Sequence, residues 1–249
     1  MKYFRYFPKD FYRYGNEGLP DYVQNLSIYV NILDQAKNNI SLYNDYYILE
    51  GERPDQVSYK LYDTPNYHWS FLIMNDKIRE KGWPLTNSQV TTKAQKDFPS
   101  TILKTYSPMI VDGESILKIG ETIENIEQSK TAVITGRDVN MGHLKIRPIT
   151  GSFREEDIVR VVGTEPTIVV DSVVEEYNSI KYYLDQNDNQ IGLGIDPETG
   201  GLVPPGALVT PFTYLDYYRI QNDDLRQIRI IKPELIVEIV SLFREALKS

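Results

Sequence analysis

The stretch from Tyr46 to Asp76 constrains the fold more than any other part of the sequence, because strand, helix and turn signals follow one another closely there. It opens with Tyr46-Tyr47-Ile48-Leu49, a short run of residues that favour strands. Pro54 and Asp55 favour a helix start, since a proline in the first turn gives up no hydrogen bond. Residues 63–66 are typical of a turn. A second helical pattern follows, so the predicted order is strand, helix, turn, helix.

Both predicted helices have an apolar side. In the first helix, Val57, Leu61 and Tyr62 are spaced so that they share one face. The second helix is apolar on most sides and ends at Asn75 and Asp76, which suit a turn. Its apolar residues are Tyr67, Trp69, Phe71, Leu72, Ile73 and Met74. We therefore expect Trp69 to be buried as an anchor of a small packed module.

The order of these elements resembles the LysM-like core of the baseplate wedge proteins of contractile-tailed phages, the T-even-like family. In that family a Tyr-rich strand precedes Gly-x-x-Pro-Glu/Asp, a helix ends in Leu/Ile-Tyr, and a Tyr-x-Trp helix runs into Asn-Asp. The matching residues are Tyr46, Tyr47, Gly51, Pro54, Asp55, Leu61, Tyr62, Tyr67, Trp69, Asn75 and Asp76. The module core that we predict is Tyr47, Gly51, Pro54, Leu61, Tyr62, Trp69, Leu72 and Asn75.

Two further motifs resemble the same family. Trp83-Pro84-Leu85-Thr86 is similar to a motif that precedes a short helix, here predicted over residues 88–96 with Thr86 or Asn87 as its cap. The run Leu225-Arg226-Gln227-Ile228-Arg229-Ile230-Ile231 is similar to the family signature Leu-Arg-Gln-Ile-Lys/Arg-Ile-Ile. The resemblance thus covers residues 22–104 and 216–249, and the middle of the chain lies outside it.

A terminal helix is predicted after Pro233, which suits a helix start. It has an apolar stripe and further apolar residues away from that stripe, so we expect it to pack against two surfaces. The stripe consists of Ile236, Ile239, Val240, Phe243 and Leu247, and the residues outside it are Leu235, Val237 and Leu242.

We predict that the segment from Leu225 to Leu247 is the main partner-binding element, because apolar residues left over from the chain's own core usually mark interfaces. Large apolar side chains are expected to anchor the contact, and two arginines to orient it by pairing with acidic groups. The predicted interface residues are Leu225, Arg226, Ile228, Arg229, Ile230 and Phe243.

The N-terminal residues 1–24 are rich in Tyr and Phe, and their Pro and Gly residues argue against a long helix. This aromatic arm should dock either on the chain's own core or on a neighbouring subunit, and both alternatives stay open. Residues 26–33 alternate between apolar and polar side chains and are predicted to form a strand.

From about Tyr106, short strand-like runs alternate with glycine-containing turns, which is typical of an all-β barrel or sandwich over residues 106–195. The predicted strands are Ile116–Ile119, Thr131–Thr135, Leu144–Ile149, Ile158–Val162, Thr167–Val174 and Ile180–Leu184. The fold class is therefore α+β: a LysM-like βααβ module, an inserted β-rich region and a C-terminal helix. The expected divisions are 1–45 (arm and strand), 46–104 (module), 105–215 (inserted β-rich domain) and 216–249 (C-terminal strand, helix and partner segment).

Composition excludes several classes of function. The net charge of −8 is unfavourable for nucleic-acid binding, and we expect no membrane span because no run of 18 or more apolar residues occurs. The N-terminus has no apolar segment typical of a signal peptide. Cysteine is absent, so disulfides and thiolate metal sites are excluded.

No catalytic residue, cofactor or metal site is predicted. The two histidines, His68 and His143, are isolated in sequence and suggest no catalytic triad or metal centre. Asp185-x-Asn187-x-Asn189 opens like a calcium loop, but Gln190 stands where glycine is needed and Asp196 replaces the bidentate glutamate. A polar turn is the interpretation that we adopt there.

The resemblance implies a non-enzymatic structural subunit of the tail baseplate wedge, made and assembled in the host cytoplasm and located in the virion. Its expected partners are other wedge subunits, the sheath initiator and the central hub, in a sixfold hetero-oligomer. The alternative is a LysM-type module that binds peptidoglycan or chitin, with its groove near residues 51–53 and 75–77. A tail-associated cell-wall hydrolase is a third possibility.

Overall fold

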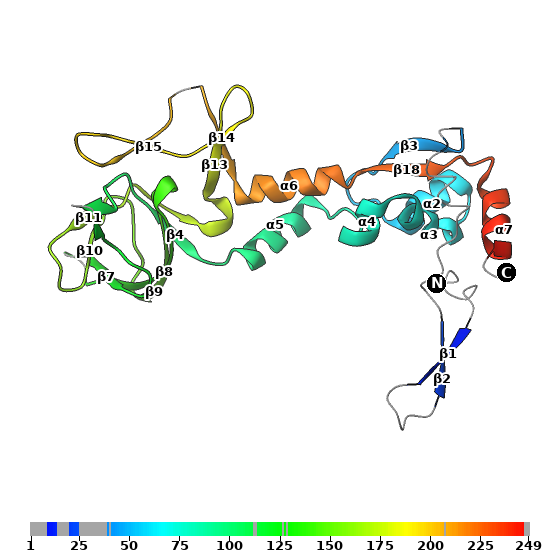
Figure 1. The fold of residues 1–249 in the computed structure, drawn as a ribbon, viewed down its shortest axis with the longest axis horizontal. Coiled ribbons are helices and arrows are strands. Elements are labelled where there is room, and N and C mark those ends of the chain that lie inside the picture. The colour runs from blue at the N-terminus through cyan, green and yellow to red at the C-terminus, as the bar shows by residue number, and fades with distance from the viewer. Residues whose placement is uncertain are drawn as a thin grey trace. The chain divides into compact units, whose positions relative to one another are not determined.

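The computed structural model describes residues 9–13, 20–24, 39, 41–111, 114–125, 127, 129–206 and 208–246 (Figure 1). The chain mixes helices with strands and contains one mostly-sheet region, which confirms the coarse α+β prediction. It divides into two compact units. Unit 1 comprises Met1–Asn87 and Gln221–Ser249, and unit 2 comprises Ser88–Ile220.

Unit 1 contains a two-stranded antiparallel sheet of β3 (Tyr43–Tyr47) and β18 (Gln227–Ile231). The helices of this unit are α2 (Pro54–Tyr62), the 3-10 helix η2 (Pro65–Tyr67), α3 (Trp69–Met74), α4 (Asp76–Lys81) and α7 (Ile236–Ala246). The strand that closes the sheet therefore comes from the far end of the sequence.

The start of α2 follows local sequence signals. Pro54 occupies the first turn, where its missing N–H group is not needed. The Gln56 side chain accepts a hydrogen bond from the backbone N–H of Arg53 at 3.0 Å, which satisfies a donor just before the helix. The helix ends at Asp63, whose φ of 54° places it in the left-handed region that commonly terminates helices.

Two apolar clusters form the core of unit 1. The first joins β3 and β18 to the helices and contains Ile48, Val57, Phe71, Ile78, Leu225, Ile228 and Ile230. The second joins α3 to α7 and contains Trp69, Met74, Ile231, Ile236, Ile239, Val240 and Phe243. Strand β18 contributes to both clusters, so it links the two parts of the core.

Unit 2 contains a seven-stranded antiparallel sheet in the order β11-β10-β7-β8-β9-β4-β12. The two edge strands, β11 and β12, are consecutive in sequence and separated by two residues, so the sheet curves back on itself around a closed core. In sequence order its strands are β4 (Thr101–Lys104), β7 (Thr122–Asn125), β8 (Thr131–Asp138), β9 (His143–Thr150), β10 (Ile158–Val161), β11 (Thr167–Val169) and β12 (Ser172–Glu175). The core that it encloses includes Leu103, Ile123, Ile134, Leu144, Val159 and Ile168.

Unit 2 contains further strands and helices besides this sheet. A three-stranded sheet has the order β14-β13-β17, and β15 pairs with β16, as β5 does with β6. Their bounds are β5 (Ile110–Val111), β6 (Glu114–Ser115), β13 (Ile180–Leu184), β14 (Gln190–Ile191), β15 (Gly194–Ile195), β16 (Leu202–Val203) and β17 (Thr210–Thr213). The helices are α5 (Asn87–Asp97), η3 (Val139–Met141), η4 (Glu176–Asn178) and α6 (Tyr214–Asp224). The division between the units falls at the start of α5 and within α6.

The β-rich region begins earlier than residue 105, where the sequence analysis placed its start. Strand β4 hydrogen-bonds to both β9 and β12, so residues 101–104 belong to the sheet of unit 2. The predicted strand Ile116–Ile119 does not form, and the predicted strand Thr167–Val174 is two strands, β11 and β12. Helix α6 starts at Tyr214 and so crosses the predicted division between residues 215 and 216.

The described part of the N-terminal arm is an antiparallel pair of strands, β1 (Lys9–Arg13) and β2 (Pro20–Gln24). Phe11 and Tyr22 lie opposite each other in this pair, and their rings meet edge to face with centroids 4.4 Å apart. Both side chains are more than half exposed. The strand predicted over residues 26–33 lies outside the described residues.

Candidate partner-binding surface

The two sequence stretches that carry the family resemblance meet in one sheet. Tyr46 lies opposite Ile228 in the β3–β18 ladder, and the ladder continues beyond the strands through a hydrogen bond from Ile48 N to Arg226 O at 2.9 Å. The first stretch supplies β3, α2 and α3, and the second supplies β18. Residues separated by about two-thirds of the chain therefore build one module.

The Asn75 side chain connects the end of α3 to β18 by hydrogen bonds. Its side-chain Nδ2 donates to the carbonyl oxygen of Arg229 at 2.8 Å, and its Oδ1 accepts from the backbone N–H of the same residue at 2.7 Å. The carboxamide thus pairs with Arg229 as a neighbouring strand would. Nδ2 also donates to Phe71 O at 2.9 Å, within the last turn of α3.

Tyr62 and Trp69 connect the helices to the C-terminal segment. The Tyr62 hydroxyl donates to Ile231 O at 2.8 Å, and burial raises the pKa of this phenol well above its usual range. Trp69 is 8% exposed and stacks on Phe243 of α7, with ring centroids 5.0 Å apart. Both residues were predicted as members of the module core.

Arg226 was predicted to orient a contact with a partner. Instead, its side chain lies inside unit 1. Its side chain is 6% exposed and forms ion pairs with Glu50 and Asp223. It also donates to two backbone carbonyl oxygens, Ile48 O at 3.4 Å and Leu85 O at 3.3 Å. The arginine therefore organises the unit's own loops, because guanidinium is well suited to several acceptors at once.

The expected apolar anchors of the partner interface are buried as well. Ile228 and Ile230 contact the helices in one core cluster, and Phe243 packs on Trp69 in the other. Leu225 is also buried. These four side chains fill the unit's own core, so they leave no stripe on its surface. Of the predicted interface residues only Arg229 is exposed, and its guanidinium lies over the Tyr43 ring at 4.8 Å.

One predicted core residue lies on the surface. Tyr47 is 56% exposed, since it belongs to the face of β3 opposite Tyr46 and Ile48. Gly51 has a φ of 77°, which explains why the chain uses glycine between β3 and α2. Leu61 and Leu72 pack at the edge of the cluster that contains Phe71.

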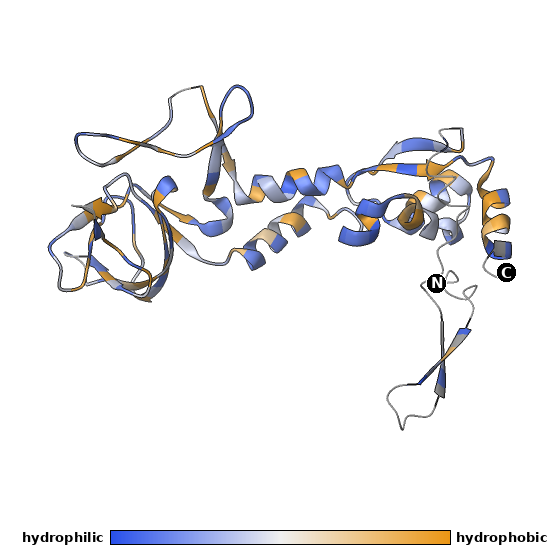
Figure 2. Cartoon of the chain, viewed as in Figure 1, coloured by the Kyte–Doolittle hydropathy of each residue, from blue (hydrophilic) through white to orange (hydrophobic). Residues whose placement is uncertain are grey.

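Several apolar side chains of unit 1 remain exposed and form the candidate contact residues. On α7, Val237 and Leu242 are exposed, while the stripe of Ile236, Ile239, Val240 and Phe243 faces the core. Figure 2 shows hydrophobic and hydrophilic residues following one another along α7. Leu247 lies outside the described residues. Further exposed side chains on this unit are Tyr47, Leu49 and Tyr59.

A polar groove of about 500 Å³ also lies in unit 1. Its lining comprises Asp45, Met74, Asn75, Asp76, Lys77, Ile78, Asp224, Leu225, Gln227, Ile228 and Arg229. Lys77 and Asp224 form an exposed ion pair at 2.6 Å across it. None of these lining residues is aromatic, so the groove offers no ring on which a sugar could stack.

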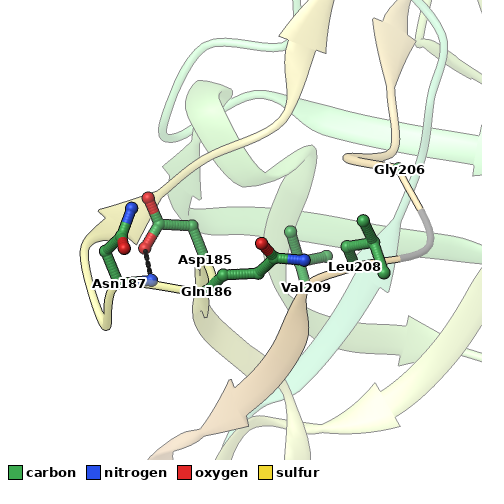
Figure 3. Close-up of a pocket in the computed structure, with 6 residues that line it drawn as sticks. All are labelled: Asp185, Gln186, Asn187, Gly206, Leu208 and Val209. Atoms are coloured by element: carbon green, nitrogen blue, oxygen red, sulfur yellow. Dashed lines mark hydrogen bonds between the residues drawn. The ribbon is translucent and has the colours of Figure 1, made fainter.

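In unit 2, the segment that opens like a calcium loop is a polar turn beside a cavity of about 360 Å³ (Figure 3). Asp185 Oδ1 accepts from the backbone N–H groups of Asn187 and Asn189, both at 2.8 Å. The Asn189 side chain donates to Oδ2 at 3.0 Å and, together with these bonds, lowers the pKa of Asp185. The carboxylate therefore organises its own turn.

The two histidines belong to different units. The His68 ring nitrogen Nδ1 lies 2.7 Å from Pro65 O at the start of α3, whereas His143 is buried in unit 2, where burial lowers its pKa to about 4. No group of three or more His, Asp or Glu residues that could hold a metal ion occurs in the part of the chain that the structure describes. In that same part, no helix is long and apolar enough to cross a membrane.

Several hydrogen bonds that hold unit 1 together could not be predicted from the sequence. The Trp83 indole donates to Glu52 O at 2.7 Å, and the Glu52 carboxylate accepts from Tyr46, Leu49 and Lys60. Asn222 pairs with the backbone of Leu85 through both its Oδ1 and its Nδ2. The sequence shows the Trp-Pro motif, but it does not show that Glu52 O accepts a hydrogen bond from the Trp83 indole.

No protein-family model matches the sequence, and a comparison with curated proteins finds no significant match either.

Proposed function

We propose that the chain is a structural, non-enzymatic subunit of the baseplate wedge of a contractile phage tail, built around a LysM-like core. One observation supports the proposal most strongly: the two stretches that resemble the family pair with each other in the β3–β18 sheet. Strand β3, helices α2 and α3, and strand β18 follow the order strand, helix, helix, strand that the family pattern implies. Unit 2 is inserted between the second helix and the second strand.

The contacts of the motif residues support the same proposal. Asn75 pairs with the backbone of Arg229, and Tyr62 donates to Ile231 O. Each contact joins a residue of the first stretch to a residue of the second. A sequence pattern that resembles a family in both stretches, and whose residues bond to each other, is better explained by a shared module than by chance in either stretch.

In the proposed assembly, the exposed face of α7 contacts neighbouring wedge subunits. Val237 and Leu242 are the apolar residues available there, because the opposite stripe is used by the core. The partners are other wedge subunits, the sheath initiator and the central hub, in a sixfold arrangement, as the resemblance implies. The protein would be located in the baseplate of the virion.

An electron cryo-microscopy reconstruction of the tail of the phage that encodes this chain tests the proposal. We expect density for unit 1 at the baseplate, in six copies around the tail axis. A Val237→Asp, Leu242→Asp double variant should fold but fail to enter the baseplate, because two charges would be desolvated at the contact. The matched control is Glu238→Gln on the same helix, which should assemble normally. Absence of the chain from the baseplate would refute the proposal.

Binding to cell-wall glycan is the alternative function, and we expect it to be absent. The groove beside Asn75 and Lys77 is the place where such a ligand would lie, but its lining lacks an aromatic ring. Calorimetric titration with chitotetraose or with peptidoglycan fragments should give no saturable heat, whereas a chitin-binding LysM domain titrated in parallel should. Saturable binding that disappears on changing residues 51–53 or 75–77 would favour the glycan-binding function.

A further inference from the structure

We propose that the outer edge of β3 accepts an extended strand from a different polypeptide, one with a basic side chain opposite Asp45 and apolar side chains opposite Tyr43 and Tyr47. This inference goes beyond the baseplate proposal, since it rests only on the geometry of unit 1 and holds whatever assembly contains the chain. It assigns a mode of binding, β-strand addition, to a particular edge of the sheet.

The alternation of the ladder shows which backbone groups of β3 point outward. The hydrogen bonds from Ile48 N to Arg226 O and from Lys232 N to Leu42 O lie at its two ends. In an antiparallel ladder every second residue bonds to the partner strand, so Asn44 and Tyr46 face β18. The N–H and C=O groups of Tyr43, Asp45 and Tyr47 are therefore directed away from β18.

The outer edge of β18 is closed by side chains. Asn75 satisfies both the N–H and the C=O of Arg229, and the Tyr62 hydroxyl satisfies the C=O of Ile231. These bonds occupy the positions that an added strand would need. Strand addition at the outer edge of β18 is thereby disfavoured.

No residue that the structure describes closes the outer edge of β3 in this way. Within the described part of the chain, no hydrogen bond is made to the backbone groups of Tyr43, Asp45 and Tyr47. The strand contains no proline and no lysine, and its pairing with β18 shows no bulge. These are the features with which proteins commonly block an edge strand. Asp45 and Tyr47 are both exposed.

Charge decides between a second copy and a different polypeptide. A second copy that pairs symmetrically through all three outward residues would place Asp45 directly opposite Asp45, and like charges at directly opposite positions are destabilising. A strand with lysine or arginine at that position would instead form a favourable cross-strand pair. Tyr43 and Tyr47 then favour apolar neighbours, because aromatic residues pair well with β-branched ones.

The test uses the full chain and two blocked peptides, Thr-Val-Thr-Lys-Thr-Val-Thr and the same peptide with glutamate in place of lysine. Amide hydrogen exchange is followed by NMR. At a peptide concentration of roughly ten times its dissociation constant, the lysine peptide should slow exchange at Tyr43, Asp45 and Tyr47 about tenfold. The glutamate peptide should bind more weakly and protect these amides less at equal concentration.

Two variants make the test specific. Asp45→Pro removes the outward N–H but no bond to β18, since residue 45 does not donate to that strand. It should abolish protection at Tyr43 and Tyr47 while the β18 amides keep their slow exchange. Asp45→Lys retains the N–H and should reverse the preference, so that the glutamate peptide binds better. This second variant decides the matter if the proline variant fails to fold.

Three results would overturn the proposal. The outward amides of β3 could already exchange slowly in the free chain, which would mean that the chain itself covers this edge. The lysine peptide could leave their exchange unchanged. Finally, Asp45→Lys could leave the order of the two peptides as in the wild type, which would remove the charge assignment on which the choice of partner depends.

Discussion

Replacing Trp69 by alanine is expected to lower the free energy of unfolding of unit 1 by about 3–5 kcal/mol. The indole is 8% exposed and stacks on Phe243 of α7, so its removal leaves a cavity between α3 and α7. Aromatic stacking adds to the loss. Because natural domains are stable by only about 5–15 kcal/mol, the variant should be largely or partly unfolded near physiological temperature.

Thermal unfolding followed by circular dichroism measures this effect, and hydrogen exchange assigns it to unit 1. The matched control is Tyr59→Ala on α2, which removes an aromatic ring that is 62% exposed. Surface changes of this kind usually alter stability by less than about 0.5 kcal/mol. Equal melting curves for Trp69→Ala and the wild type would show that the indole does not support the core, and would indicate a surface role for it.

In the first stretch of unit 1 the bounds of α2 could be predicted because their signals are local, whereas β3 lies at Tyr43–Tyr47, three residues before the start of the predicted run. Pro54 fixes the start of α2, and Asp63 lies in the turn that follows it. The separate helix α4 was missed because Asn75, Asp76 and Lys77 suit a turn as well as a helix start. Here Asn75 is fixed by its bonds to Arg229, which is 154 residues away in sequence, so no local signal could reveal them.

The apolar anchors predicted for an interface on β18 and α7 are buried in the chain's own core, for a reason that the sequence does not contain. Apolar residues on two sides of an element require two contact surfaces, but the pattern cannot say whether both belong to the same chain. In this protein β18 gives Ile228 and Ile230 to one core cluster and Ile231 to another. What remains for partners is the smaller set of Val237 and Leu242 on α7.

In unit 2 the predicted strand runs other than Ile116–Ile119 fall on β8 to β13, whereas β4, β7 and the short strands were not predicted, and neither was the boundary of the sheet with the rest of the chain. The pairing of β4 with β9 and β12 is long-range, so four residues before the predicted boundary belong to the sheet. The start of helix α6 does have a local sequence signal, a pair of capping residues. Thr213 and Asp216 form a reciprocal capping box, with Thr213 N bonded to Asp216 Oδ2 at 3.1 Å and Asp216 N to Thr213 Oγ1 at 3.1 Å.

Replacing Asp157 by alanine is expected to destabilise unit 2 by about 3–5 kcal/mol, because it leaves a buried lysine without its counter-ion. Lys130 Nζ lies 3.1 Å from Asp157 Oδ2, and the two side chains are 10% and 6% exposed. The same carboxylate oxygen accepts from the backbone N–H of Arg154 at 2.8 Å, so a second, partly buried bond is lost. Denaturant unfolding with hydrogen exchange in unit 2 measures the effect.

A second substitution separates the cost of a lost bond from the cost of an unpaired charge. In the wild type, Lys130→Met should destabilise unit 2, since it leaves the Asp157 carboxylate buried without its cation. In the Asp157→Ala background the same change should be stabilising, because it removes the uncompensated ammonium. This reversal of sign is expected only if the two charges are coupled in the folded state. If Lys130→Met has the same effect in both backgrounds, the pair contributes no coupling, and the loss in Asp157→Ala must come from the bond to Arg154 alone.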